Sequence, residues 1–369
     1  MAKGAYIGVN GVACKVKKGY VGVDGVARKI KRAYIGIGGV ARPCWSGGEL
    51  AYYGKITSLS SAVQWLAATS VGNYALFGGG ATSSGDVTTV NAYDTNLTKT
   101  TPTAFAQSKA SHAATRVGNY ALFGGGRYLG SPSATVYAYD ASLTRSTPTA
   151  LNKGRYDLAA ASVGNYALFG GGDGDSSSYR TIVDAYNTSL TRSSPTKFSA
   201  SKKEHAATSV GNYALFGGNG TTVEAYNTNL TRTNPTALSN GRASLAATSV
   251  GNYALFGGGH YNEQLSTVDA YDASLTRSTP TALSQARQYL AATSVGDYAL
   301  FGGGQYNYAS YATVDVYDAS LTRTTAASLN TVRCYLAATS VGNYALFGGG
   351  TADTNYDRIS NIVDAYTVA

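Results

Sequence analysis

The chain has 369 residues, of which 44% are hydrophobic and 13% charged, and it contains 45 glycines and 30 tyrosines. This composition favours strands and tight turns over helices, and it supplies enough apolar material for a large core. It argues against a membrane-spanning helix, because no run is apolar over the necessary length, and its three cysteines (Cys14, Cys44 and Cys334) are too few and too scattered for a disulfide framework or a zinc cluster.

The net charge of +9 is concentrated at the N-terminus. Residues 1–46 carry a balance of +8, and the rest of the chain carries +1. The large C-terminal part therefore has no general attraction to nucleic acid. Because the chain opens without the apolar core of a secretory signal, we expect it to be made in the cytoplasm and to stay there or leave by another route.

Residues 1–46 contain a repeat of 14 residues, centred on the dipeptides Asn10-Gly11, Asp24-Gly25 and Gly38-Gly39. These dipeptides tolerate the positive φ angles of two-residue turns, so each unit is expected to be a β-hairpin. Three such hairpins give a thin sheet that needs a partner, either other subunits or a docking surface. The strands after the turns alternate apolar and basic residues, and the candidate attachment residues are Lys15, Lys17, Lys18, Arg28, Lys29, Lys31 and Arg32.

Three interpretations of these basic residues stay open: a solvated face that protects sheet edges, attachment to an acidic partner, and nucleic-acid contact. The last is the least favoured, because no aromatic residues alternate with the charges. The run Tyr6-Ile7-Gly8-Val9-Asn10-Gly11-Val12-Ala13 resembles short N-terminal repeats in tail-associated structural proteins of phages and prophages of Gram-positive bacteria. The resemblance covers residues 5–45 and implies a virion or phage-tail-like particle, anchored through this end.

Residues 47–54 are interpreted as a linker, and one longer unit repeats from about residue 55 to 369. Its signature, Val71-Gly72-Asn73-Tyr74-Ala75-Leu76-Phe77, returns at intervals of 46, 46, 47, 40, 45 and 46 residues. Each unit contains four short strands separated by turn residues, which is the pattern of a propeller blade. The sequence therefore predicts an all-β fold, a seven-bladed β-propeller preceded by a small β-hairpin repeat module.

The double glycine after an apolar strand, followed by a strand containing tyrosine, resembles the kelch repeat. The units depart from kelch repeats where Pro-Thr-Ala-Leu stands in place of the usual fourth-strand tryptophan. The last unit ends at Ala369 after only three strands. In the other units the fourth strand ends in a leucine or phenylalanine twelve residues before the valine of the next unit, and Leu59 stands at the same distance before Val71. We therefore expect a strand at 55–59 to complete the seventh blade and close the ring.

The link between the second and third strands is the part of the unit that varies in length, and the link between the fourth and first strands varies in its residues. In a four-stranded blade these links share one end, so both should gather on one face of the disc, where variable loops on a rigid scaffold usually build recognition. Simple drift of surface loops is the alternative. The candidate ligand-binding residues on this face are Tyr128, Arg155, Tyr156, Tyr179, Tyr261, Arg287, Tyr289, Tyr306, Tyr308, Arg333, Tyr335 and Tyr356.

No catalytic constellation is recognisable. His112 and His205 occupy a position held by leucine in the other repeats, so packed roles are expected, and Asp184, Asp269, Asp315 and Asp364 recur as part of the blade pattern. The pair Asp173 and Asp175 lacks the rest of a calcium loop, and the glycine runs lack the lysine of a phosphate loop. The sequence therefore favours a non-enzymatic protein with no cofactor and no metal.

The leading hypothesis is a virion or tail-associated structural and receptor-binding protein. It would contact other particle proteins through residues 1–46 and present the variable face to a cell-surface glycan or protein, without membrane insertion. Tyrosine, arginine and aspartate suit stacking on sugar rings and hydrogen bonding to hydroxyls. The alternatives are an intracellular kelch-like scaffold for another protein, a propeller enzyme such as a glycan hydrolase or an oxidase, and a decorative virion protein without a ligand. Self-association stays open.

Overall fold

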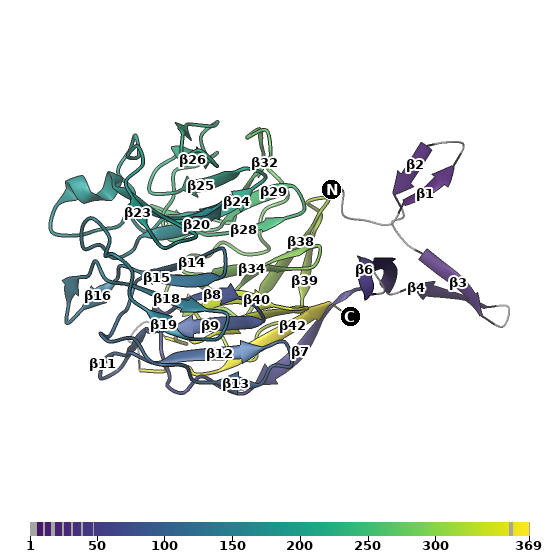
Figure 1. Cartoon of the computed structure of the whole chain (residues 1–369), viewed down its shortest axis with the longest axis horizontal. Helices are drawn as coiled ribbons and strands as arrows, with labels where there is room; N and C mark the ends of the chain where they lie inside the picture. Colours follow the sequence, from purple (N-terminus) through teal and green to yellow (C-terminus); the bar gives the residue numbers. More distant parts are fainter. Residues whose placement is uncertain are drawn as a thin grey trace.

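The computed structural model describes residues 48–353 and 357–368, together with the backbone of six strands within residues 6–46 (Figure 1). Those six strands pair as three separate two-stranded antiparallel sheets, β1 with β2, β3 with β4 and β5 with β6. Each pair flanks one of the three turn dipeptides of the sequence, so the pairing follows the 14-residue repeat. Their bounds are Tyr6–Val9, Val12–Lys15, Gly19–Val23, Val26–Ile30, Arg32–Ile37 and Val40–Ser46.

Seven four-stranded antiparallel sheets follow, which confirms the seven-bladed propeller. The first strands, which lie innermost, are β8 (Ala67–Val71), β14 (Ala113–Val117), β20 (Ala159–Val163), β24 (Ala206–Val210), β28 (Ala246–Val250), β34 (Ala291–Val295) and β40 (Ala337–Val341). The second strands are β9 (Tyr74–Gly78), β15 (Tyr120–Gly124), β21 (Tyr166–Gly170), β25 (Tyr213–Gly217), β29 (Tyr253–Gly257), β35 (Tyr298–Gly302) and β41 (Tyr344–Gly348).

The third strands are β12 (Val90–Asp94), β18 (Val136–Asp140), β22 (Val183–Asn187), β26 (Val223–Asn227), β32 (Val268–Asp272), β38 (Val314–Asp318) and β42 (Val363–Val368). The fourth strands are β13 (Lys99–Thr100), β19 (Arg145–Ser146), β23 (Arg192–Ser193), β27 (Arg232–Thr233), β33 (Arg277–Ser278), β39 (Arg323–Ala326) and β7 (Leu50–Ile56). None of the described segments is a helix with the length and apolarity needed to cross a membrane.

The blades pack through their second and third strands. The second strands are buried on both faces because each lies between two neighbouring blades, as their continuous apolar runs predict. A Cβ atom on Gly348 of the seventh blade would lie 2.8 Å from the ring of Phe77 in the first, so glycine permits this close approach. The third-strand tyrosines add a hydrogen bond between blades: the hydroxyl of Tyr139 donates to the carbonyl of Thr103 at 2.6 Å.

The first and last described strands of the propeller close the ring. Strand β7 pairs with β42, with Val363 opposite Ile56 and Val368 opposite Leu50. Closure by the N-terminal strand was predicted from the sequence, but at 55–59, and residues 50–54 were placed in the linker. The strand is instead Leu50–Ile56. The prediction was wrong because Leu59, from which it was counted, packs in the core after the strand has ended, as the equivalent Leu151 does in its blade.

The two faces of the disc differ as expected. In six of the seven blades the second-to-third link forms a backbone bridge with the link that precedes its own blade, for example Arg127 with Ala110 and His260 with Ala243, so both variable links share one face. On the opposite face, where the Val-Gly-Asn turns lie, Val368 near the C-terminus donates its N–H to the carbonyl of Asn343 in the seventh blade at 3.1 Å. Because Leu50 pairs with Val368, the chain joins the propeller at this opposite face.

Candidate functional site

Seven residues form a closed ring of backbone hydrogen bonds around the propeller axis. One residue from each fourth-to-first link donates its N–H to the carbonyl of its counterpart in the preceding blade, at distances from 2.7 Å for Ser244 to 3.1 Å for Trp65. The N–H of Trp65 reaches the carbonyl of Tyr335 and completes the circle. The ring consists of Trp65, Ser111, Asp157, Glu204, Ser244, Tyr289 and Tyr335.

All seven ring residues adopt the left-handed backbone conformation although none is glycine. Their φ angles lie between 49° at Glu204 and 55° at Trp65 and Tyr289. Such a conformation costs on the order of 1 kcal/mol or more for a residue with a Cβ atom, and residues of this kind gather at functional sites. The surrounding structure therefore imposes the same unfavourable geometry seven times.

A second set of left-handed residues shows what a purely structural position looks like. In the turn after the third strand, leucine is left-handed in six blades, with φ of 63° at Leu97 and 62° at Leu321, and the residue type never changes. The axial ring instead carries five residue types on one backbone geometry. The fold therefore sets the ring's backbone but not its side chains.

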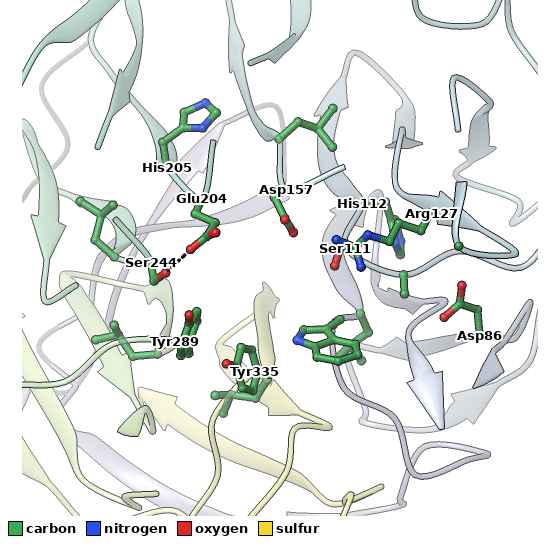
Figure 2. A pocket seen from close by; sticks show the side chains of 18 residues that line it. Asp86, Ser111, His112, Arg127, Asp157, Glu204, His205, Ser244, Tyr289 and Tyr335 are labelled. Carbon is green, nitrogen blue, oxygen red and sulfur yellow. Dashed lines mark hydrogen bonds between the residues drawn. The ribbon is translucent and has the colours of Figure 1, made fainter. Parts of the chain in front are cut away.

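The ring side chains line a cavity of about 540 Å³ on the variable face, within the usual size range of ligand sites (Figure 2). Both variable links contribute, because Asp86, Arg127 and Gly130 from the second-to-third links line it together with the ring. The apolar wall is formed by the residue that follows each ring position, which is leucine in five blades and histidine in two.

One arc of the ring is aromatic. The rings of Tyr289 and Tyr335 lie 4.2 Å apart between centroids with planes inclined by 31°. Trp65 meets Tyr335 edge-on, at 5.7 Å and 74°. Three successive blades thus place aromatic surface on one side of the cavity, as Figure 2 shows for the labelled tyrosines.

The opposite arc carries two carboxylates flanked by two serines. The hydroxyl of Ser244 donates to Oε2 of Glu204 at 2.8 Å. Burial, reinforced by the nearby charge of Glu204, raises the pKa of Asp157 to about 6, although Arg127, Lys203 and a hydrogen bond with Ser111 act in the other direction. The two acidic side chains are therefore close enough to repel each other.

Two buried histidines stand in the wall of the cavity, and burial favours their neutral form. His112 and His205 are each 7% exposed, and each ring packs edge-on against a phenylalanine, Phe105 at 5.9 Å and Phe198 at 6.0 Å. Burial lowers the pKa of His112 to about 3 and that of His205 well below its usual value. The packed roles expected from the leucine-equivalent position are confirmed.

The structure corrects three of the sequence-predicted site residues. Arg155, Arg287 and Arg333 come from the variable links, but their side chains are fully buried inside the blades. Each forms an ion pair with the recurring third-strand aspartate, at 2.7 Å for Asp184 and Asp315 and with Asp364 in the seventh blade. A buried guanidinium needs such a partner, so these arginines connect each link to the third strand of the blade that follows it, and they do not face a ligand.

The predicted tyrosines divide between cavity and rim. Tyr289 and Tyr335 belong to the ring, and the ring of Tyr156 lies 3.9 Å beneath the guanidinium of Arg127. Four others, Tyr128, Tyr261, Tyr306 and Tyr308, are exposed on short two-stranded hairpins of the second-to-third links. These hairpins pair β16 (Arg127–Tyr128) with β17 (Ser131–Pro132), β30 (His260–Tyr261) with β31 (Glu263–Gln264), and β36 (Gln305–Tyr306) with β37 (Ala309–Ser310). Tyr308 lies between β36 and β37. The first blade has a similar pair, β10 (Ala81–Thr82) and β11 (Gly85–Asp86).

Tyr179 lies half-buried in the short 3₁₀ helix η1 (Ser177–Thr181), with the Lys153 ammonium 5.6 Å from its ring. Tyr356 lies outside the described residues, as do the side chains of the candidate attachment residues at positions 15–32. The predicted attachment role therefore stays a prediction.

Sequence reasoning missed five of the seven ring positions as site residues: Trp65, Ser111, Asp157, Glu204 and Ser244. A usable signal was present, because every ring residue stands six positions before the valine of its repeat, as Trp65 does before Val71. Aligning the repeats on that valine gives a column with five residue types, but the preceding column, from Gln64 to Cys334, also has five, so the alignment narrows the choice without singling out the ring. Among the described residues, no group of three or more histidine, cysteine, aspartate or glutamate side chains could hold a metal ion.

Comparison with known proteins gives the fold alone. No family model matches the chain, and no curated protein matches its sequence. The solved structure of YjhT superposes with a TM-score of 0.57 over 70% of this chain and 95% of its own, at 12% sequence identity. At that identity the likeness carries no function. The chain is a seven-bladed β-propeller protein with an axial pocket on its variable face.

Proposed function

We propose that the propeller is a non-enzymatic carbohydrate-binding module and that its axial pocket is the binding site. The observation that carries the proposal is the ring, in which one backbone geometry presents aromatic rings on one arc and carboxylate and hydroxyl groups on the other. Aromatic faces stack on the apolar face of a sugar ring, and oxygen acceptors bind its hydroxyls. A pocket with both on opposite sides suits a sugar held between them.

The wider role that we propose is receptor binding by a structural protein of a phage tail or related particle, with a cell-surface glycan as receptor. Two features support it. The basic excess lies in residues 1–46, in a repeat that resembles those of phage tail-associated proteins, and the chain joins the propeller at the face opposite the pocket. Attachment through the N-terminal hairpins would leave the pocket directed away from the particle.

The direct experiment is a glycan array probed with the full-length protein. A separate thermal melt of the same preparation, with a cooperative transition, shows that the protein is folded. We expect the protein to bind a restricted set of glycans on the array. Excess soluble glycan of the same kind should abolish this binding by competition. A uniformly blank array with folded protein would overturn it.

A glycan hydrolase is the second candidate, because the ring places two carboxylates, Asp157 and Glu204, in adjacent positions with different surroundings. Glycoside hydrolysis generally needs one protonated and one ionised carboxyl group beside the scissile bond. Incubating the bound glycans with the protein and measuring new reducing ends separates the two candidates. Turnover that Glu204→Gln abolishes would establish the hydrolase, and unchanged glycan supports a binding module.

A further inference from the structure

The charged side chains that line the pocket are mostly acidic. Asp86, Asp157 and Glu204 face one cation, Arg127, whose guanidinium is already packed on Tyr156 at 3.9 Å. The two lining histidines are neutral, because burial lowers their pKa values. An anionic ligand would therefore meet a net negative site.

The acidic pair on the ring is only partly compensated. The N–H of Glu204 donates to the carbonyl of Asp157 at 3.0 Å, so the two side chains leave neighbouring points of the ring. Lys203, which lies near them, is ion-paired with Asp173 at 3.0 Å. A positive group placed between the two carboxylates would lower their mutual repulsion and gain charge-assisted hydrogen bonds.

The opposite arc suits the same ligand. The faces and edges of Trp65, Tyr335 and Tyr289 form a continuous aromatic wall, and aromatic faces attract cations as well as sugar rings. A ligand with a sugar face on one side and an ammonium group on the other satisfies both arcs at once.

We propose that the axial pocket selects a ligand that bears a protonated amine, and that the carbohydrate it takes is an amino sugar whose amino group is not acetylated. The amine lies between Asp157 and Glu204, and the sugar ring lies against Tyr335. This inference rests on the proposed carbohydrate binding and narrows its substrate class.

Isothermal titration calorimetry of the full-length protein tests it with three trimers of one linkage: cellotriose, the corresponding trimer of glucosamine and the trimer of N-acetylglucosamine. The expected result is that the glucosamine trimer binds at least about tenfold more tightly than the other two, a difference of about 1.4 kcal/mol. Glu204→Gln, whose amide oxygen can still accept from Ser244, should remove that preference, and Asp157→Asn should do the same. Glu263→Gln, on the exposed hairpin strand β31 outside the pocket, is the matched control and should keep it.

Equal affinity for all three trimers, or a preference that survives in both pocket variants, would overturn the amine inference while leaving carbohydrate binding in place. So would failure of the glucosamine trimer to bind to a protein that captures neutral or acidic glycans on the array. A blank array together with no heat from any trimer would overturn both.

Discussion

Tyr52 donates a hydrogen bond of 2.6 Å to Oδ1 of Asp364, although the two residues are 312 positions apart in the chain. The same carboxylate is ion-paired with the buried Arg333 and accepts the backbone N–H of Asn330. One aspartate thus ties together the N-terminal strand β7, the C-terminal strand β42 and the link that precedes the seventh blade. The closure of the ring depends on this group as well as on the strand pairing.

We expect Tyr52→Phe to lower the free energy of unfolding by about 1 kcal/mol, because it removes one donor from a buried carboxylate and leaves the aromatic packing on Tyr366 intact. Urea unfolding followed by fluorescence measures the change. Tyr53→Phe is the control: Tyr53 is 56% exposed on the same strand, and its variant should change stability by less than about 0.5 kcal/mol. Equal effects of the two variants would contradict a role for Tyr52 in closure.

The buried ion pairs inside the blades should be costly to break. Arg242 and Asp269 pair at 2.8 Å with both side chains fully buried, so Asp269→Asn leaves a buried guanidinium without its counter-charge and should cost about 3–5 kcal/mol. Asp353→Asn is the matched control, because the side chain of its partner Arg358 is 71% exposed, and it should cost at most about 1 kcal/mol. Differential scanning calorimetry compares the two, and similar melting temperatures would contradict the assigned structural role.

Alanine substitutions at two glycines of the second-to-third links should distinguish the cost of a steric clash from the cost of a left-handed backbone. Gly125 and Gly130 have similar φ angles, 74° and 79°, but a Cβ atom at Gly125 would lie 2.6 Å from the carbonyl oxygen of Arg155, whereas nothing lies within 4 Å at Gly130. Both alanine variants bear the backbone cost, so Gly125→Ala should be less stable than Gly130→Ala by a further 1–3 kcal/mol or so. Chemical denaturation measures the difference, and equal stability would show that the blades relax around the added methyl group.

Asp157 should give the pocket a pH dependence. An aspartate titrates at about 3.9 in an unfolded chain and, at this site, at about 6. Well below pH 4 the carboxyl group is protonated in both states. Between about pH 4 and 6 the unfolded chain ionises while the folded protein still holds the proton, so the free energy of unfolding falls across this window and levels off above it. Asp157→Asn should therefore stabilise the protein at pH 7.5 more than at pH 4.

The NMR chemical shift of the Asp157 carboxyl carbon should change with a midpoint near pH 6 in the wild type. The midpoint should be lower in Glu204→Gln, because the charge of Glu204 helps to raise the pKa of Asp157. A midpoint near 4 in the wild type, or one that Glu204→Gln leaves unchanged, would contradict the acidic pairing.

Much of the fold could be read from the sequence, because the fold repeats. The interval of the Val-Gly-Asn turn fixed the number of blades, and the missing fourth strand after Val363 pointed to closure by the N-terminus. The error in that strand has a simple origin. Leu59 marks a packing position in the loop after the strand, so its spacing located the blade but not the paired residues, which are Leu50–Ile56.

The candidate site was harder to predict, because a residue's place in a link does not tell where its side chain points. Arg155 and Asp157 stand two positions apart in one link, yet the first is fully buried in an ion pair and the second lines the pocket. The repeats held a partial clue to the buried role: arginine stands at this position in the four blades whose third strand carries an aspartate, whereas Val63 stands there in the first blade, with Asn91. The ring of backbone hydrogen bonds is a product of closure and becomes visible only in three dimensions.

In our proposal the glycan binds at the axial ring and not at the exposed rim of the same face. The most direct test of this proposal is the affinity of an array-selected glycan for Tyr335→Ala and Tyr308→Ala, since Tyr335 lies in the ring and Tyr308 is 80% exposed on the rim. We predict a loss of more than about tenfold for Tyr335→Ala, as for an aromatic residue at the centre of a site, and less than about twofold for Tyr308→Ala. Loss of binding in Tyr308→Ala with wild-type affinity in Tyr335→Ala would contradict the account.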